Sequence, residues 1–219
     1  MTTNKIKLLE NEKITLLKEI LGRHYKKNKK NYYNLAQNKD NNDLLSINAF
    51  FPNFISSAVL CLLEVNNKNS DYNIILTKRS ENLRQHSGQI SFPGGKLDEK
   101  DKNFIDCAYR EASEEIGFNP KKAKLVGKLK KYFTGTGFLI QPIVSITDNK
   151  QKLKLNKKEV DQILHFPINY LLLESKIKKI FYKRNNIDLF YYSIKWKGFK
   201  IWGATAKILI DLVYLFRKL

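Results

Sequence analysis

Two apolar runs with branched side chains stand close together in the first half of the chain. They cover residues 58–65 and 72–77, and a polar segment separates them. Such a pair is typical of a β-hairpin whose strands are largely buried. Further strands are predicted at 125–133 and 138–146, and a second hairpin is predicted around 195–198.

Helical spacing marks three other segments. Apolar residues recur at intervals of three and four through 5–22, 104–116 and 204–216, which predicts a helix in each. Gly22 and Gly117 stand where the first two helices would end. The mixed order of hairpins and helices predicts an α+β or mixed-sheet α/β fold.

The chain divides into two unequal parts. Residues 1–44 are expected to hold the N-terminal helix and a polar connection rich in Lys, Asn and Tyr. Residues 45–219 are expected to form a single domain, since a chain of 219 residues suits one domain with a short extension.

The composition is that of a folded globular protein, with 42% hydrophobic and 28% charged residues. Its net charge of +19 would attract nucleotides, nucleic acid or an anionic membrane. Only six of the forty basic residues are arginine, however, and the lysines show no basic stripe. We therefore interpret the charge as a solvated lysine surface, which disfavours a nucleic-acid partner.

Two cysteines, Cys61 and Cys107, are too few for a disulfide framework or a zinc cluster, which favours a reducing, cytoplasmic location. The first residues lack the apolar core of a signal peptide. The apolar stretch 208–216 is interrupted by Asp211 and is too short to cross a bilayer. We expect a cytoplasmic protein without a transmembrane segment.

Three carboxylates crowd one face of the helix predicted over 104–116. Glu111, Glu114 and Glu115 stand at positions i, i+3 and i+4, and Arg110 can pair with one of them. Such crowding is costly without a cation, and hard oxygen ligands suit Mg²⁺ or Mn²⁺. The alternative for the three glutamates alone is an ordinary solvated acidic surface.

The neighbouring residues favour the metal site. Gly94 and Gly95 form a loop before the helix, Arg110 directly precedes Glu111, and Gly117 follows the helix. This arrangement resembles the Nudix box, a signature of hydrolases that act on nucleoside diphosphates linked to another group. The resemblance implies the Nudix fold, a mixed β-sheet sandwiched between α-helices, and a divalent cation as cofactor.

The loop departs from the generic box in its length. The box expects a glycine and a glutamate where this chain has Lys96 and Lys102. The loop is one residue longer, so Gly95 and Asp101 are the nearest equivalents. The Arg-Glu-x-x-Glu-Glu core at 110–115 is intact, and the expected chemistry is retained.

A second motif lies directly before the box. Residues 76–95 are similar to the signature of the coenzyme A pyrophosphatase branch of the Nudix family, which also has a longer Gly-Gly loop with paired aspartates, here Asp98 and Asp101. The resemblance covers roughly residues 55–216. It implies hydrolysis of coenzyme A or its derivatives to 3′,5′-ADP and 4′-phosphopantetheine or acyl-phosphopantetheine.

Cationic and glycine residues near this loop are candidates for binding the substrate: Arg79, Arg84, His86, Gly88 and Gly94. Guanidinium groups match phosphate, and glycines let the backbone approach a ligand. The alternative is that the arginines form surface salt bridges and that the histidine stabilises a turn.

The resemblance also assigns roles within the box. Mg²⁺ or Mn²⁺ would bind Glu111, Glu115 and Glu114, with the Gly95 carbonyl as a further ligand. Arg110 would hold a carboxylate in position for catalysis.

The general base is left open between the box and a later loop. Glu111, Glu114 and Glu159 are the candidates, since some Nudix enzymes take the base from a late loop. Asn156 and Glu159 also have the spacing of a capping box, which predicts a short helix over 159–164.

Two other functions stay open. The first is a Nudix hydrolase of another nucleoside diphosphate derivative, such as NADH or ADP-ribose, because the box determines the chemistry and not the leaving group. The second is a non-catalytic protein that binds nucleic acid or a membrane surface through its basic residues. The oligomeric state also stays open, with a homodimer as one alternative.

Overall fold

The computed structural model describes residues 15–16, 19, 54–66, 71–83, 85–147, 151–172, 174–184 and 186–216. Of the helix predicted over 5–22, only Thr15, Leu16 and Glu19 belong to the described part, and all three are helical. The rest of that helix, the polar connection and the boundary at residue 45 lie outside the described residues. Among the described residues, no helix has the length and apolar character needed to span a membrane.

The described chain forms a mixed sheet of eight strands, with the central order β3-β2-β1-β7-β5. Beside this central order, β4 pairs with β1, β8 pairs with β2, and β6 pairs with β7. β1 and β7 run parallel, and the other pairs are antiparallel. The strands are β1 (Ile55–Asn66), β2 (Asp71–Arg79), β3 (Ile90–Ser91), β4 (Gly94–Lys96), β5 (Ala123–Lys128), β6 (Tyr132–Phe133), β7 (Phe138–Thr147) and β8 (Val160–Pro167).

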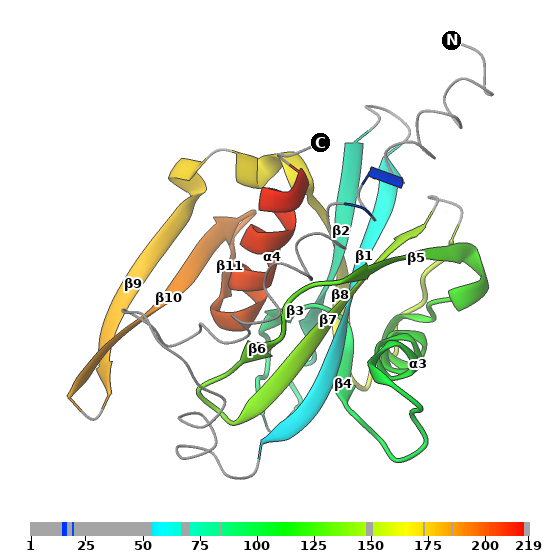
Figure 1. Ribbon diagram of the computed structural model, residues 1–219, viewed down its shortest axis with the longest axis horizontal. Helices are drawn as coiled ribbons and strands as arrows, with labels where there is room; N and C mark the ends of the chain where they lie inside the picture. Colours follow the sequence, from blue (N-terminus) through cyan, green and yellow to red (C-terminus); the bar gives the residue numbers. More distant parts are fainter. Residues whose placement is uncertain are drawn as a thin grey trace.

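Helices cover both faces of this sheet, as the sequence predicted (Figure 1). α3 (Phe104–Ile116) packs on one face and α4 (Gly203–Phe216) on the other. β1 explains both contacts, because successive side chains of a strand point to opposite faces. Leu60 and Leu62 belong to the core beneath α3, whereas Cys61 and Leu63 belong to the core beneath α4. Three short 3₁₀ segments connect the strands: η1 (Pro120–Lys122), η2 (Ile168–Leu172) and η3 (Glu174–Lys176).

The ends of α3 follow from two residues. Asn103 caps its first turn, since the side-chain oxygen accepts hydrogen bonds from the backbone N–H groups of Ile105 and Asp106. Gly117 ends the helix in the left-handed conformation, with a φ of 63°. The helix predicted over 104–116 is therefore confirmed at both ends.

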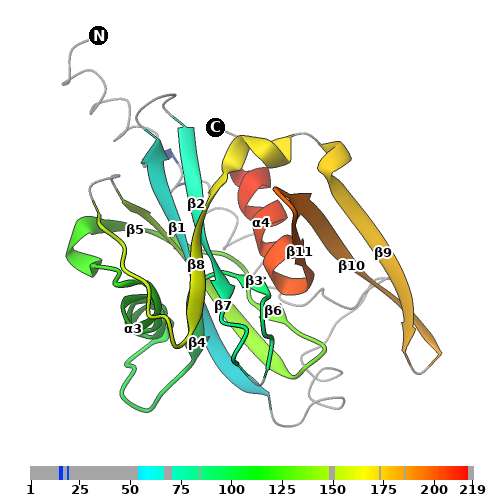
Figure 2. The ribbon, with the colours of Figure 1, turned by 180° about the vertical axis from the view of Figure 1, so that it is seen from behind.

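A second, three-stranded antiparallel sheet continues from the core and extends away from the main sheet (Figure 2). It contains β9 (Ile177–Arg184), β10 (Ile187–Trp196) and β11 (Phe199–Trp202). Lys197 and Gly198 both have positive φ, as a tight hairpin turn requires, so the hairpin predicted around 195–198 is confirmed. The rest of this sheet is not predicted by the sequence analysis.

The prediction of a short helix over 159–164 is wrong. The segment is β8, which pairs antiparallel with β2 through partners such as Leu76 and Leu164. Instead of capping a helix, Asn156 closes a turn, since its backbone carbonyl accepts hydrogen bonds from the N–H groups of Glu159 and Val160. Burial alternates along the later part of β8, where Leu164 and Phe166 are buried and His165 is exposed, and the free edge of β2 decides the conformation of this segment.

The buried carboxylate of Glu64 in this sheet bonds to His165, and we expect this pair to contribute to stability in a pH-dependent way. His165 Nδ1 lies 2.7 Å from Glu64 Oε2, and this hydrogen bond raises the pKa of His165. A raised histidine pKa stabilises the fold fully below the unfolded value of about 6.5, and the effect is lost as pH rises through the folded value. Because the side chain is 49% exposed, we expect His165→Gln to cost less than about 1 kcal/mol at pH 5.5.

Urea denaturation at pH 5.5 and pH 9 measures this effect. The cost of His165→Gln should be smaller at pH 9. His86→Gln is the matched control, because the exposed His86 ring bonds to the neutral Gln89 side chain. An equal loss of stability for His165→Gln at both pH values would contradict the prediction.

Candidate active site

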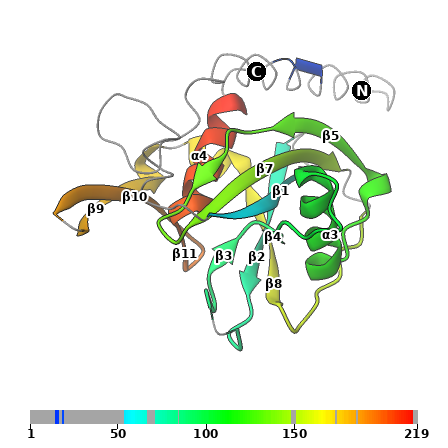
Figure 3. The same cartoon turned by 60° about the horizontal axis from the view of Figure 1, so that its bottom comes forward.

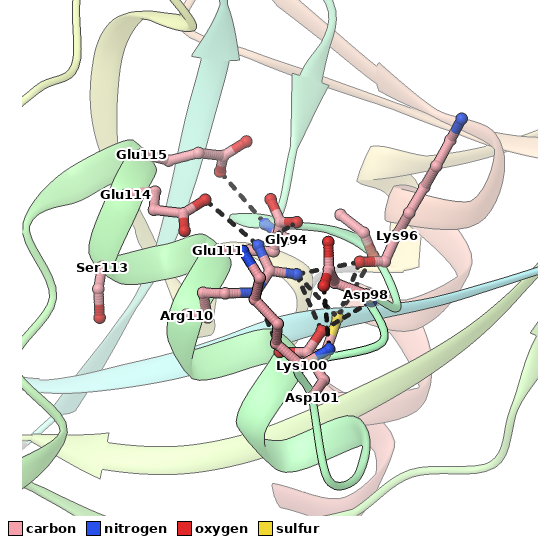
Figure 4. Close-up of polar contacts among 12 residues, drawn as sticks. Gly94, Lys96, Asp98, Lys100, Asp101, Arg110, Glu111, Ser113, Glu114 and Glu115 are labelled. Carbon is pink, nitrogen blue, oxygen red and sulfur yellow. Dashed lines mark hydrogen bonds and ion pairs between the residues drawn. The ribbon is translucent and has the colours of Figure 1, made fainter.

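Glu115 is buried near the C-terminal end of α3, with 3% of its surface exposed. Its Oε2 accepts a hydrogen bond of 3.2 Å from the backbone N–H of Gly94 (Figure 4). Arg79 Nη1 lies 3.8 Å from Oε1. Burial raises the pKa of Glu115 to about 8, and neighbouring carboxylates add to the shift. The carboxylate therefore lacks enough positive charge from the protein itself.

Glu111 lies one turn earlier on the same face of α3. Arg110 Nη1 donates to Glu111 Oε1 at 2.9 Å and to Glu114 Oε2 at 3.2 Å. Burial nevertheless raises the pKa of Glu111, and the charges of Glu114 and Glu159 add to this effect. The Glu114 side chain is 53% exposed. Arg110 thus links Glu111 to Glu114, whereas Glu115 faces Arg79.

Arg110 also anchors the preceding loop. Its Nε and Nη2 each donate to a different oxygen of Asp101 at 2.9 Å, and Nη2 donates to the Lys96 carbonyl at 3.2 Å. The Asp101 side chain is 3% exposed, and the guanidinium lowers its pKa to about 2. Asp101 is therefore the partner that holds Arg110 against the longer loop.

The two glycines of the loop meet different neighbours. A Cβ on Gly95 would lie 2.4 Å from the carboxyl carbon of Glu111. A Cβ on Gly94 would lie 2.3 Å from the Ala58 carbonyl oxygen, and Gly94 has a φ of 153°. Gly95 therefore leaves room for a carboxylate, whereas Gly94 lets β4 pack against β1.

Glu159 joins this group from the turn before β8. The backbone N–H of Asn156 donates to the Glu115 carbonyl at 2.9 Å, which attaches this turn to the end of α3. The charge of Glu159 raises the pKa values of both Glu111 and Glu115. Its Oε1 accepts a hydrogen bond of 2.8 Å from Asn156 Nδ2. The candidate from the late loop thus lies near enough to Glu111 and Glu115 for its charge to act on them.

Arg79 stands at the end of β2, where its residue pairs with Val160 of β8. Its Nε is the buried side-chain nitrogen that lacks a hydrogen-bond partner in the described part of the chain. An unpaired buried N–H is unfavourable, and an anionic ligand would supply the missing acceptor. Arg79 therefore has the properties of a phosphate-binding residue.

The other residues predicted to bind substrate lie on the loop between β2 and β3. His86 is exposed with a φ of 58°, and its Nδ1 lies 3.1 Å from Gln89 Oε1. Gly88 also has positive φ. In the described part of this loop, the His86 ring bonds to Gln89 and not to a carboxylate. Arg84 lies outside the described residues.

Cys107 is a site residue that the sequence analysis missed. Its Sγ lies 3.3 Å from the Lys96 carbonyl oxygen and 3.7 Å from that of Gly95. Burial raises the pKa of the thiol to about 12, so it supports the loop as a neutral donor. The only signal in the sequence is its apolar position on the inner face of the helix.

The donor set suits a hard cation. Glu111, Glu114 and Glu115 offer only oxygen, and because burial raises the pKa values of Glu111 and Glu115, a cation would stabilise their charged forms. The side chains do not stand ready-made as a cage, since no three His, Cys, Asp or Glu residues of the described ranges converge as metal ligands. Arg110 already occupies one oxygen each of Glu111 and Glu114.

Comparison with protein families matches residues 55–183 to the NUDIX domain, which is more than half of the chain. The chain belongs to the Nudix family. The match includes every strand of the main sheet, the box helix α3 and Glu159. Family membership supports hydrolysis of a pyrophosphate bond in a nucleoside diphosphate derivative.

Two relatives carry names that agree with this assignment. "Uncharacterized Nudix hydrolase NudL" of Photorhabdus laumondii is 35% identical over 139 residues, covering 64% of this chain and 74% of that protein. "Nudix hydrolase 15, mitochondrial" of Arabidopsis thaliana is 34% identical over 161 residues, covering 71% of this chain and 56% of its own length. A crystal structure of a MutT protein from Methanosarcina mazei Go1 aligns with a TM-score of 0.48 and 18% identity, over 75% of this chain and 96% of that one.

Proposed function

We propose that this Nudix hydrolase cleaves the pyrophosphate bond of coenzyme A or its derivatives. The products would be 3′,5′-ADP and 4′-phosphopantetheine or its acyl form. Two observations together carry the proposal. Burial raises the pKa values of Glu111 and Glu115, and the buried Nε of the neighbouring Arg79 lacks a hydrogen-bond partner. A divalent cation and a phosphate together would satisfy both needs.

Glu111, Glu114 and Glu115 are the residues that would hold Mg²⁺ or Mn²⁺, with the Gly95 carbonyl as a further ligand. When bound, the cation supplies charge for the phosphate oxygens and makes a bound water more acidic. Glu115 is the most buried of these glutamates, and a bound cation would offset the cost of burying its negative charge.

The remaining residues would bind the substrate and move the proton of the attacking water. Arg79 would donate to a phosphate oxygen through its free Nε. Arg110 would keep Glu111 oriented. Glu111, Glu114 and Glu159 are the candidates for the base, and Glu159 is favoured because Arg110 holds the other two.

Coenzyme A is favoured over other nucleotides because of the motif at 76–95. The 3′-phosphate of coenzyme A calls for an additional cation, and the loop between β2 and β3 offers Arg84 and His86 for this role. The cytoplasm is the compartment that we propose for this reaction. NADH and ADP-ribose are the competing substrates.

Product analysis tests the proposal. The purified protein is incubated with coenzyme A, acetyl-coenzyme A, NADH or ADP-ribose and either Mg²⁺ or Mn²⁺, with a chelated control, and products are separated by mass. We expect 3′,5′-ADP from the coenzyme A substrates only when metal is present. Faster cleavage of NADH or ADP-ribose would overturn the choice of substrate, and no cleavage of any compound would overturn the enzymatic proposal.

The bridging contacts of Arg110 to Asp101, Glu111 and Glu114 predict that a lysine cannot replace it. Lysine keeps the charge but cannot bridge both oxygens of Asp101 and two glutamates at once. We expect Arg110→Lys to lower kcat about 10- to 100-fold and the free energy of unfolding by about 1–3 kcal/mol, measured by steady-state kinetics and urea denaturation. Arg110→Ala is the comparison. A lysine variant close to the native enzyme, with only the alanine variant impaired, would show that charge alone suffices.

A further inference from the structure

An aromatic ladder crosses the outer face of the three-stranded sheet. It consists of Tyr182 on β9, Tyr191 on β10 and Trp202 on β11. The strand register places Leu189 opposite Tyr182 and Ser193 opposite Trp202, so all three rings share one face. The ring centroids are 5.9 Å apart between Tyr182 and Tyr191, and 5.6 Å apart between Tyr191 and Trp202.

This face is also positively charged. Lys178, Lys195 and Lys200 lie on the same face of the sheet as the ladder and are exposed. Lys200 Nζ lies 5.9 Å from the ring centroids of both Tyr191 and Trp202. Among the described residues of this face there is no Asp or Glu. The described part of the face is therefore purely cationic.

The ladder is not part of the core. The opposite face of the same sheet is buried through Ile194, Trp196 and Ile201, whereas Tyr182 is 43% and Trp202 41% exposed. The match to the NUDIX domain ends at residue 183, so β10 and β11 lie beyond it. Core packing does not account for the exposed rings of Tyr182 and Trp202, and the family match does not reach Tyr191 or Trp202.

We propose that the aromatic ladder is a binding platform for single-stranded nucleic acid. Exposed aromatic rings stack on unpaired bases, and neighbouring cations bind the phosphates between them, which is the usual combination in such proteins. A net charge of +19 would strengthen the attraction. The sequence alone disfavoured this partner because the lysines looked scattered, and the fold places three of them on the same face as the rings.

Two other partners fit the surface less well. Insertion into a membrane would require an apolar hairpin tip, but the β9–β10 hairpin ends near the exposed ion pair of Lys183 and Asp188, whose charged atoms are 3.9 Å apart. If β9 paired with β9 of a second copy, lysines on both faces of the strand, Lys178 and Lys179, would be placed near the lysines of the other copy and would repel them. A polyanion avoids both problems.

Fluorescence anisotropy of the full chain with a fluorescein-labelled 12-nucleotide oligouridine tests the proposal, with a 12-base-pair duplex for comparison. We expect tighter binding of the single strand and at least about fivefold weaker binding for Tyr182→Ala and for Trp202→Ala. Trp202→Phe should retain binding. Phe181→Ala is the matched control, because Phe181 is 68% exposed on the other face of the same hairpin.

The lysines give a second readout. Replacing both Lys195 and Lys200 by Gln should reduce the dependence of affinity on salt. Equal losses for Phe181→Ala and Trp202→Ala, or stronger binding of the duplex, would overturn the proposal in favour of a general charge effect. Absence of binding, or self-association abolished by Trp202→Ala in sedimentation, would also overturn it.

Discussion

Replacing Glu115 by Gln is expected to lower hydrolysis at least about 1000-fold, equivalent to about 4 kcal/mol of transition-state stabilisation. The amide keeps the shape of the side chain and can still accept the hydrogen bond from Gly94. It removes the negative charge that would bind the cation and that faces Arg79 at 3.8 Å. The loss should therefore arise in catalysis and not in folding.

The free energy of unfolding distinguishes a loss of catalysis from a loss of folding. A neutral amide costs less to bury than a carboxylate, so the free energy of unfolding of Glu115→Gln at pH 7 should equal or exceed that of the native protein. Urea denaturation and steady-state kinetics measure both quantities. Glu99→Gln makes the same change on the exposed loop and should leave activity unchanged. Hydrolysis by Glu115→Gln near the native rate would refute the assignment of Glu115 to the metal.

The helix α3 could be predicted because its signals are local. The glutamate spacing, the Gly94–Gly95 loop and the terminal Gly117 all lie within 24 consecutive residues, so the sequence alone indicates helix, loop and box. The first hairpin was also predictable, since only a short polar stretch of sequence separates β1 from β2. In each case the residues that determine the structure are neighbours along the chain.

The position of Glu159 could not be predicted, because it depends on distant segments. Asn156 bonds to the end of α3, and β8 continues along the edge of β2. A helix over 159–164 would have satisfied the same local pattern. The strand forms because β2 offers unpaired backbone groups, and this pairing is what brings Glu159 beside Glu111 and Glu115.

The aromatic ladder could not be predicted from the sequence either, because it also depends on segments that are distant along the chain. Tyr182, Tyr191 and Trp202 are evenly scattered in the sequence, and only the register of three antiparallel strands places them in a row. Charge composition is misleading in the same way, since a lysine count says nothing about which lysines share a face with aromatic rings.

The two adjacent glycines of the loop are expected to fail in different ways when each is replaced by alanine. Gly94→Ala would place a Cβ against the backbone of β1 at a φ of 153°, and neither strand can move without breaking their pairing. We expect a loss of about 3 kcal/mol or more in the free energy of unfolding. For Gly95→Ala, the three atoms nearest to the new Cβ all belong to the Glu111 carboxyl, which can rotate away.

Gly95→Ala should therefore change stability by less than about 1 kcal/mol, because the side chain that it displaces is flexible and half-buried. Its kcat should fall about tenfold or more, since a rotated Glu111 loses its hydrogen bond to Arg110. Urea denaturation and kinetics on both variants provide the comparison, and each variant is the control for the other. Equal destabilisation of the two would contradict this division, because it would mean that the loop tolerates no Cβ at either position and that Gly95 serves the fold and not the carboxylate.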